Sequence, residues 1–309
     1  MKKISVVTFV NSSFSSINYN LSECDDIALL EVEKRVSSIF KTLFHLLKTH
    51  KRLDYVIVNY VTLYYIFGFI LTFLGVKTIF IPHEGEPLFP KELHSNIIGV
   101  RRLLAKKKHT QRCIDNSFST LFLSNLQQKE FKSKNSSVIH IGSNADFFYN
   151  RFSWDERNGI LFPSRKNEKI KGYDIISSLD YLLINKDGVY SQEEIAIAYA
   201  KAKIVVIPSI IESYSFSMIE AMLSNCIIVT SINVGLANDL LLEHSIEKLE
   251  GLGIYILDDI NDINEFILNK FFIGNAIIHE PKTRKFALDI GLNAKYIPIK
   301  LKQIIHELE

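Results

Sequence analysis

The segment KIVVIPSIIESYSFSMIEAMLSN, residues 203–225, places two glutamates in a stretch that is otherwise almost entirely apolar or hydroxyl-bearing. The part KIVVIPS is typical of a buried parallel strand, and SMIEAMLSN opens a helix. Glu212 lies in the connecting loop and Glu220 in the first turns of that helix. The helix N-terminus, near Ser217, suits a phosphate. An unpaired buried charge is costly, so the pair indicates a site, but acidic residues are also ordinary at helix N-termini. Both interpretations stay open on the pair alone.

Strand and helix signals alternate outward from this segment along the whole chain. Apolar residues at helical spacing predict a helix over 25–50, and Ser191 with Glu194 predicts a capping box. Such alternation favours parallel sheets with helices on both faces. The expected strands are 4–10, 54–60, 76–82, 119–123, 137–141, 159–163, 203–208, 227–231 and 253–257.

The polar and aromatic stretch DFFYNRFSWDERNG, residues 146–159, breaks the alternation and marks a domain boundary. We therefore expect an α/β protein of two Rossmann-like, doubly wound domains, residues 1–150 and 151–309. The last helix could pack back on the first domain. Such domains bind ligands at the carboxyl ends of their strands, so a cleft between them is the expected site.

Composition is that of a globular protein, but the charge is uneven. Residues 1–150 carry 19 Lys and Arg against 12 Asp and Glu, a balance of +7, and the remainder carries 17 against 22, a balance of −5. The basic half is expected to face something anionic. Three isolated cysteines and a strand that begins close to Met1 predict a reducing, cytoplasmic location without a secretory signal.

Residues 55–76 contain no charged residue and are long enough for a membrane span. We interpret them instead as a buried strand, DYVIVNY, followed by a buried helix that ends at Gly75. The next strand would then be VKTIFIP.

The segment from Pro208 resembles the signature of glycosyltransferase family 4, the retaining nucleotide-sugar transferases of GT-B fold. Its pattern is a strand ending in Pro-Ser, a Glu, seven residues and then Glu-Ala-Met, followed by a strand and an Asn-Val-Gly turn. Here these are Pro208, Ser209, Glu212, Glu220–Met222 and residues 233–235. GILFPSRKNEKIKGYDII is similar to the family's first strand of the second domain, and IFIPHEGEP to a strand ending in a His.

The resemblance implies a donor site made by the second domain. Glu212 and His83 would be catalytic and contact the transferred sugar. Arg165 and Lys171 would bind the donor phosphates, with Lys169 a competing choice, and Glu220 would accept hydrogen bonds from the ribose. The remaining expected donor-binding residues are Ser213, Tyr214, Ser215, Phe216 and Ser217. The donor would be of UDP or GDP type, with no cofactor and no metal, because LDDIND at 257–262 is better explained as a helix cap.

The chain departs from the family pattern in two places. The loop after the first strand, NSSFSSINY, lacks the usual glycines. The interval between Gly172 and Lys203 is short, and a strand–helix–strand piece is missing, so we expect a shortened second domain.

A basic run on a predicted helix, RRLLAKKKHTQR at 101–112, is a separate feature. Its cations could meet an anionic membrane surface or a polyprenyl-diphosphate-linked acceptor, or form a solvated face. Nucleic acid is disfavoured because interleaved aromatic residues are missing. The cations in question are Arg101, Arg102, Lys106, Lys107 and Lys108.

The leading hypothesis is a retaining glycosyltransferase that uses a nucleotide diphosphate sugar and a glycan or lipid-linked acceptor. Surface polysaccharide synthesis, such as that of lipopolysaccharide, would be its setting, at the inner face of the plasma membrane. The alternatives are a non-catalytic GT-B-like binding subunit and a DNA-modifying glycosyltransferase.

Overall fold

The computed structural model describes residues 3–10, 27–83, 85, 88, 100–166, 168–182, 191–273 and 279–308, with the backbone alone for 100–106 and 180–182. The chain forms two compact units. The first runs to Ile141 and takes in residues from Ala294 onward, and the second is Gly142–Asn293. The division therefore lies ahead of the stretch at 146–159 in which the sequence analysis placed it.

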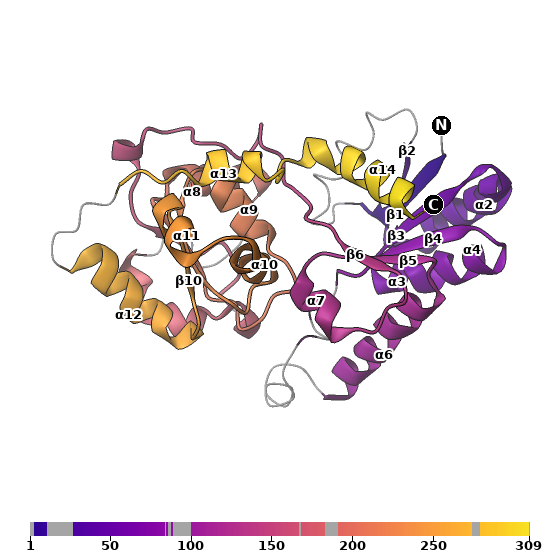
Figure 1. The fold of residues 1–309 in the computed structure, drawn as a ribbon, viewed down its shortest axis with the longest axis horizontal. Helices are drawn as coiled ribbons and strands as arrows, with labels where there is room; N and C mark the ends of the chain where they lie inside the picture. Colours follow the sequence, from indigo (N-terminus) through magenta and orange to yellow (C-terminus); the bar gives the residue numbers. More distant parts are fainter. Residues whose placement is uncertain are drawn as a thin grey trace. The chain divides into compact units, whose positions relative to one another are not determined.

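The first unit is built on a parallel sheet of six strands in the order β2-β1-β3-β4-β5-β6 (Figure 1). Parallel strands are buried on both faces, which explains why β3 is apolar and buried at nearly every position. The strands are β1 Ile4–Phe9, β2 Ile27–Val32, β3 Tyr55–Asn59, β4 Lys77–Ile81, β5 Ser119–Phe122 and β6 Ser136–Val138.

Strand β2 corrects the sequence analysis, which expected helix from residue 25. The chain is extended over Ile27–Val32 and pairs in parallel with β1, Ile27 opposite Ile4. Helix α2 begins only at Val36 and runs to Thr49. Only Ile27 and Val32 of IALLEV are buried, and their odd spacing puts them on opposite faces of the strand. No alternation of buried and exposed residues therefore marks this edge strand, and its residues also fit a helix.

The charge-free stretch 55–76 is the predicted strand and helix. After β3 come α3 Val61–Leu63, a π turn at Tyr64–Gly68 and α4 Phe69–Phe73. A Cβ on Gly68 would lie 2.6 Å from the Tyr64 ring, so only glycine lets this ring pack against the turn. The Tyr64 hydroxyl pairs with Thr78 Oγ1 at 2.8 Å, and burial raises the pKa of Tyr64 to about 12. Within the described ranges, no helix is both long and apolar enough for a membrane crossing.

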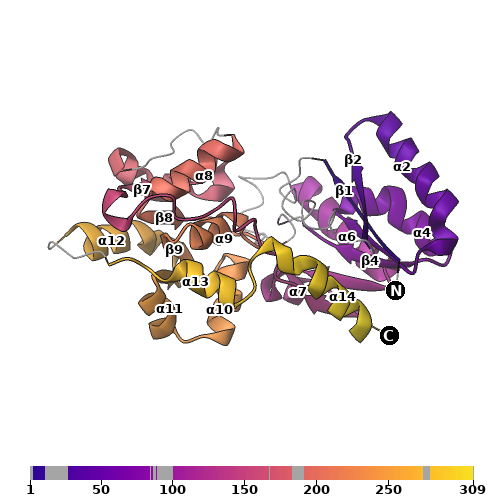
Figure 2. The same ribbon diagram turned by 90° about the horizontal axis from the view of Figure 1, so that it is seen from above.

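The remaining helices of the first unit are α6 Val100–Asn116, α7 Asn125–Glu130 and α14 Ile297–Glu307. Helix α14 ends the chain yet lies beside the strands of the first unit in both views (Figures 1 and 2). It buries Ile297, Leu301 and Ile305, and Lys300 Nζ donates to the His140 carbonyl at 2.9 Å. This is the arrangement that the sequence analysis left open for the last helix.

Over the residues that the structure describes, the second unit has a parallel sheet of four strands in the order β10-β9-β8-β7, in agreement with the predicted shortened α/β domain. Its strands are β7 Ile160–Leu161, β8 Ile204–Ile207, β9 Ile227–Ser231 and β10 Ile254–Leu257. Its helices are α8 Gln192–Lys201, α9 Phe216–Leu223, α10 Gly235–Glu243, α11 Ile246–Leu252, α12 Ile263–Ile267 and α13 Thr283–Asp289. The predicted capping box opens α8: Ser191 accepts from the Glu194 N–H, and the Glu194 carboxylate accepts from the Ser191 N–H.

Candidate functional site

A tight turn is docked against the carboxyl end of β8. Residues Lys169–Lys171 form one turn of 3-10 helix that ends at Gly172 with a φ of 73°. A Cβ at Gly172 would lie 1.8 Å from the Pro208 carbonyl oxygen, so only glycine permits this approach. The Ile210 N–H also donates to the Ile170 carbonyl at 2.9 Å. The Lys-Gly pair of the sequence is thereby fixed beside the loop that carries Glu212.

The Glu212 carboxylate is held from two sides. Lys171 Nζ lies 3.1 Å from its Oε1, and the Ser209 hydroxyl donates to its Oε2 at 2.9 Å. Both members of the ion pair are largely shielded, with side-chain exposures of 25% for Lys171 and 19% for Glu212. Pairing and hydrogen bonding offset the cost of partly burying this charge. The structure thus brings together Lys171 and Glu212 and adds Ser209, which we had noted only as part of a motif.

The backbone of Glu212 is anchored to the turn after β9. Its N–H donates to the Asn233 carbonyl at 3.0 Å, and the Gly235 N–H donates to the Glu212 carbonyl at 2.8 Å. Together they form an isolated parallel bridge between Glu212 and Val234. The Asn-Val-Gly turn therefore sets the position of Glu212 and begins helix α10.

Helix α9 starts directly beyond this loop. Ser215 is its N-cap and accepts a hydrogen bond from the Met218 N–H at 3.3 Å. Ser213, Tyr214 and Ser215 are buried, and Phe216 and Ser217 are half-buried. The start of the helix offers N–H groups and a positive dipole end, which suit an anion.

Glu220 lies on the second turn of α9. Burial of its carboxyl group raises the pKa of Glu220 to about 8, and the nearby Tyr199 acts more weakly in the opposite direction. The buried Tyr199 hydroxyl lies near Glu220 and Ser217. The Tyr199 hydroxyl makes no hydrogen bond of standard length and angle with them, so its influence on Glu220 is electrostatic. The surroundings keep a proton on Glu220 at neutral pH.

Tyr199 was not foreseen, because nothing in the sequence of α8 sets it apart from a core tyrosine.

The other basic residues of this region are less engaged. Arg165 is exposed, and its Nη1 lies 3.4 Å from Glu168 Oε1. Lys169 is exposed, whereas Lys171 is half-buried at Glu212. The geometry therefore favours Lys171 over Lys169 as the cation of the cluster.

His83 belongs to the first unit, where it follows β4. Its ring lies 4.4 Å from that of Tyr60, centroid to centroid. Burial lowers the pKa of His83 well below its ordinary value, so the imidazole is neutral at physiological pH. Tyr60 has a φ of 67°, which is costly for a residue other than glycine. The carboxyl edge of this sheet thus carries an aromatic, uncharged group of side chains.

Gln127, which was not predicted, forms hydrogen bonds with backbone groups that follow β4 and β5. Its Nε2 donates to the Pro82 carbonyl at 3.1 Å, and its Oε1 accepts from the Leu123 N–H at 3.1 Å. Ser124, the N-cap of α7, accepts from the Gln127 N–H at 3.1 Å. This amide therefore links the residues that follow β4 and β5, in addition to the pairing of the two strands in the sheet.

The basic run of α6 is only partly within the described side chains. Those of Arg101, Arg102 and Lys106 lie outside it, Lys107 pairs with Glu130, and Lys108 is exposed. The predicted contact of these residues with an anionic surface stays a prediction.

Asp259 caps the 3-10 turn Ile260–Asp262 that precedes α12, because its carboxylate accepts from the Asn261 N–H at 2.8 Å. Asp262, the N-cap of α12 itself, makes no capping hydrogen bond with its side chain, so the expected cap lies one turn ahead of the helix. No group of three or more metal-binding side chains occurs among the residues that the structure describes.

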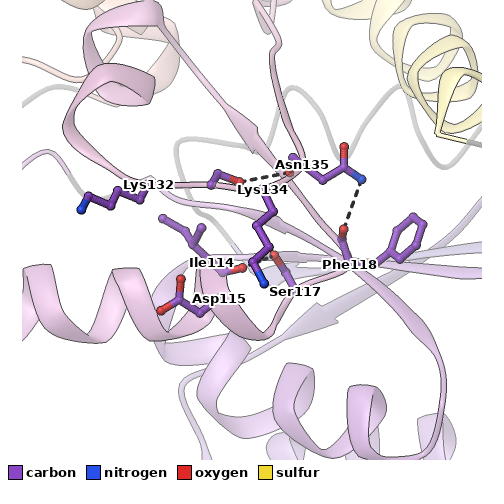
Figure 3. A pocket seen from close by; sticks show the side chains of 8 residues that line it. Ile114, Asp115, Ser117, Phe118, Lys132, Lys134 and Asn135 are labelled. Atoms are coloured by element: carbon purple, nitrogen blue, oxygen red, sulfur yellow. Dashed lines mark hydrogen bonds between the residues drawn. The ribbon is translucent and has the colours of Figure 1, made fainter.

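Figure 3 shows a cavity of about 400 Å³ elsewhere in the first unit. It lies where β5 and β6 begin, the edge opposite to His83. Asn135 Nδ2 donates to the Phe118 carbonyl there at 3.3 Å (Figure 3). Predicted site residues are not part of its lining, which is Ile114, Asp115, Ser117, Phe118, Lys132, Ser133, Lys134 and Asn135.

Comparison with known proteins identifies the fold. No protein-family model and no curated protein sequence matches the chain. Among solved structures, it is similar to a sucrose-phosphate synthase from Thermosynechococcus elongatus, with a TM-score of 0.71 and 11% identity over 100% of this chain and 99% of that one. It is also similar to HepE of Anabaena in complex with UDP, with a TM-score of 0.67 and 12% identity over 99% and 100%.

A third similar structure is WaaG, a glycosyltransferase involved in lipopolysaccharide biosynthesis, with a TM-score of 0.64 and 11% identity over 98% of this chain and 99% of that one. These neighbours are GT-B glycosyltransferases, and the predicted GT-B fold class is confirmed.

Proposed function

We propose that this protein is a retaining glycosyltransferase of family 4 type. It takes a sugar from a nucleotide diphosphate donor, of UDP or GDP type, and transfers it to a glycan or polyprenyl-diphosphate-linked acceptor. The observation that carries the proposal is the cluster of Glu212, Lys171 and Ser209 at the carboxyl end of β8, beside the start of α9. Ligands of open α/β sheets bind at such ends.

Each part of the cluster has a chemical task in this reaction. Cleavage of the sugar–phosphate bond leaves negative charge on the diphosphate, which Lys171 and the N–H groups at the start of α9 would stabilise without a metal. Glu212, oriented by Ser209, would bind sugar hydroxyls and offset positive charge near the anomeric carbon. Glu220 would accept hydrogen bonds from ribose hydroxyls once it has lost its proton.

The structural neighbours support a choice of donor and setting. HepE has been crystallised with UDP and with UDP-glucose, which favours a UDP-type donor here. WaaG acts in lipopolysaccharide biosynthesis, which supports surface polysaccharide assembly at the inner face of the plasma membrane. The basic run of α6 would meet the acceptor's diphosphate or the membrane there.

Thermal stabilisation by nucleotides tests this proposal. UDP, GDP, ADP, CMP and dTDP are each added with EDTA to the wild type and to Lys171→Ala. A ligand that binds only the folded state raises its stability by mass action, by about 2.7 kcal/mol at one hundred times its Kd. We expect one diphosphate to raise the melting temperature of the wild type by much more than it raises that of Lys171→Ala.

A non-catalytic binding subunit is the competing function, and the four-stranded second sheet favours it. Its discriminating variant is Glu212→Gln, which keeps the shape of the side chain and removes its charge. A transferase would lose sugar transfer by about a hundredfold or more while still binding nucleotide. If no diphosphate stabilises a well-folded wild type, the binding-subunit function replaces the transferase.

A further inference from the structure

Helix α2 exposes a stripe of large apolar side chains. Val36 is 69% exposed, Phe40 65% and Phe44 70%, and Leu47 completes the series at 39%. These residues follow one another at spacings of four, four and three, so they lie on one side of the helix. Single exposed apolar residues are ordinary on a protein surface, but a contiguous stripe indicates an interaction.

Packing within the first unit does not require this stripe. The core-facing side of α2 is made by Thr42 and Leu46, both buried, with Ile39 and Leu43 partly buried against the core. The stripe lies next to that side, so the apolar surface of α2 continues round the helix from the core into solvent.

Cations border the stripe. Lys41 and Lys48 are both exposed and seven residues apart, each one position after a stripe residue, so they share the border beyond it. Arg35 is the N-cap, and the first turn holds no acidic residue. Arg35 Nε already lies 3.5 Å from Glu33 Oε2, so Lys41 and Lys48 are the cations that carry the positive charge at the border of the stripe.

Helix α4 also exposes large apolar side chains. Phe73 at its end is 90% exposed, and Ile70 and Leu74 are each more than a third exposed. Figures 1 and 2 both draw α4 next to α2.

We propose that α2 and α4 form a docking surface for an anionic phospholipid bilayer. A helix with Phe and Leu on one side and Lys beside them lies in the interface plane, with the apolar side chains among the acyl chains and the cations at the headgroups. A second copy of this chain is a poorer partner, because it would bring Lys41 and Lys48 against the same cations. This surface differs from the basic run of α6, and it does not depend on the donor chemistry.

Vesicle co-sedimentation without any nucleotide tests the proposal. The full chain is mixed with vesicles of phosphatidylcholine alone, or of phosphatidylcholine and phosphatidylglycerol in equal parts. We expect binding to the anionic vesicles that weakens as salt is raised. Phe40→Ser and Phe44→Ser should each weaken it about tenfold, and Lys41→Gln and Lys48→Gln about fivefold each.

Matched controls come from the second unit. Leu242→Ser removes a side chain that is 59% exposed on α10, and Lys201→Gln removes an exposed cation on α8. Both should bind anionic vesicles as the wild type does. All these positions are exposed, so each variant should keep the wild-type melting temperature.

Two results would overturn the proposal. One is wild-type vesicle affinity in the Phe40→Ser/Phe44→Ser double variant. The other is a dimer in sedimentation equilibrium that the same double variant dissociates, with no vesicle binding by the wild type. Either result would leave nucleotide stabilisation unaffected, so a failure here is distinguishable from a failure of the proposed transferase.

Discussion

After β8, the second unit gathers a carboxylate, an ammonium group and a hydroxyl within hydrogen-bonding distance. After β3 and β4, the first unit instead places the ring of Tyr60 against a neutral imidazole. Glu212, Lys171 and Ser209 satisfy one another. His83 instead lies against Tyr60, and burial keeps the pKa of its imidazole low. Both edges are carboxyl ends of parallel sheets, so the fold does not determine their chemistry.

The difference is consistent with two kinds of ligand contact. A charged, hydrogen-bonded edge can stabilise a diphosphate, whose charge changes during the reaction. An aromatic and uncharged edge can contact the apolar face of a sugar and offer one imidazole to a hydroxyl. The predictions below test each edge separately.

The largest effect is expected at Gly172, which positions Lys171. Alanine there adds a Cβ that would overlap the Pro208 carbonyl, at a backbone φ of 73°. Overpacking together with the left-handed conformation should lower the free energy of unfolding by about 3 kcal/mol or more. Urea unfolding of Gly172→Ala measures this loss.

Gly75→Ala is its matched control in the first unit. Gly75 has a φ of 80°, but a Cβ there would meet nothing within 4 Å. It should cost only the left-handed penalty, about 1 kcal/mol. Equal losses in the two variants would mean that the docking of the turn on Pro208 does not stabilise the second unit.

Glycine shows what the sequence could and could not predict. The Lys-Gly pair and the two glutamates were identified through the resemblance of their segments to a family signature, which is a local pattern of strand, loop and helix. The approach of Gly172 to Pro208 could not be predicted, since it depends on how two loops distant in sequence pack. The predicted helix over Ile27–Val32 was wrong for a related reason. These residues form strand β2, and its pairing with β1 is a tertiary contact that outweighs the local helical pattern.

The second prediction contrasts how the two edges respond to pH. Glu220 has a pKa of about 8, raised by burial. Ribose hydroxyls donate to the ionised carboxylate, so donor binding requires loss of this proton. Below pH 8, nucleotide affinity should fall by about tenfold for each pH unit, and binding should release a proton into the buffer. Isothermal titration calorimetry in buffers of different ionisation enthalpy measures both quantities.

Glu220→Gln provides the control, because its amide cannot titrate. The nucleotide affinity of this variant should be lower than that of the wild type at pH 8 and should not change with pH. His83 should add nothing to the profile near neutrality, because its pKa is lowered well below the ordinary value. A wild-type profile that is flat between pH 6 and 8 would contradict the role of Glu220. The same raised pKa makes Glu220 lower the free energy of unfolding as the pH rises from 4.5 towards 8.

Side-chain environments account for most of what the sequence analysis missed at the site. It named Lys171 and Lys169 as competitors, and only the docked turn separates them, with Lys171 at Glu212 and Lys169 in solvent. Tyr199 and Gln127 were not predicted at all. Tyr199 lies near Glu220, and Gln127 holds the carbonyl of Pro82, the residue before His83. Core packing alone would explain both residue types, so neither is set apart in the sequence.

The smallest effect on stability is expected at Arg165. Its pair with Glu168 is exposed, and such pairs contribute little, so Arg165→Ala should change the free energy of unfolding by less than about 0.5 kcal/mol. If the Arg165 guanidinium binds the donor diphosphate, the thermal stabilisation by nucleotide should still fall in Arg165→Ala. The fall should be smaller than in Lys171→Ala, because the Lys171 ammonium group is already held at Glu212 in the wild type.

Glu168→Ala removes the partner of Arg165 and leaves the cation in place. This variant should keep the wild-type nucleotide stabilisation, or increase it, because Arg165 no longer has a competing carboxylate. Equal stabilisation of Arg165→Ala and the wild type by nucleotide would exclude Arg165 from the donor site. Among the groups proposed here, Lys171 and the start of α9 would then be its only source of positive charge. The charged edge of the second unit would be confined to the loops that Gly172 holds together.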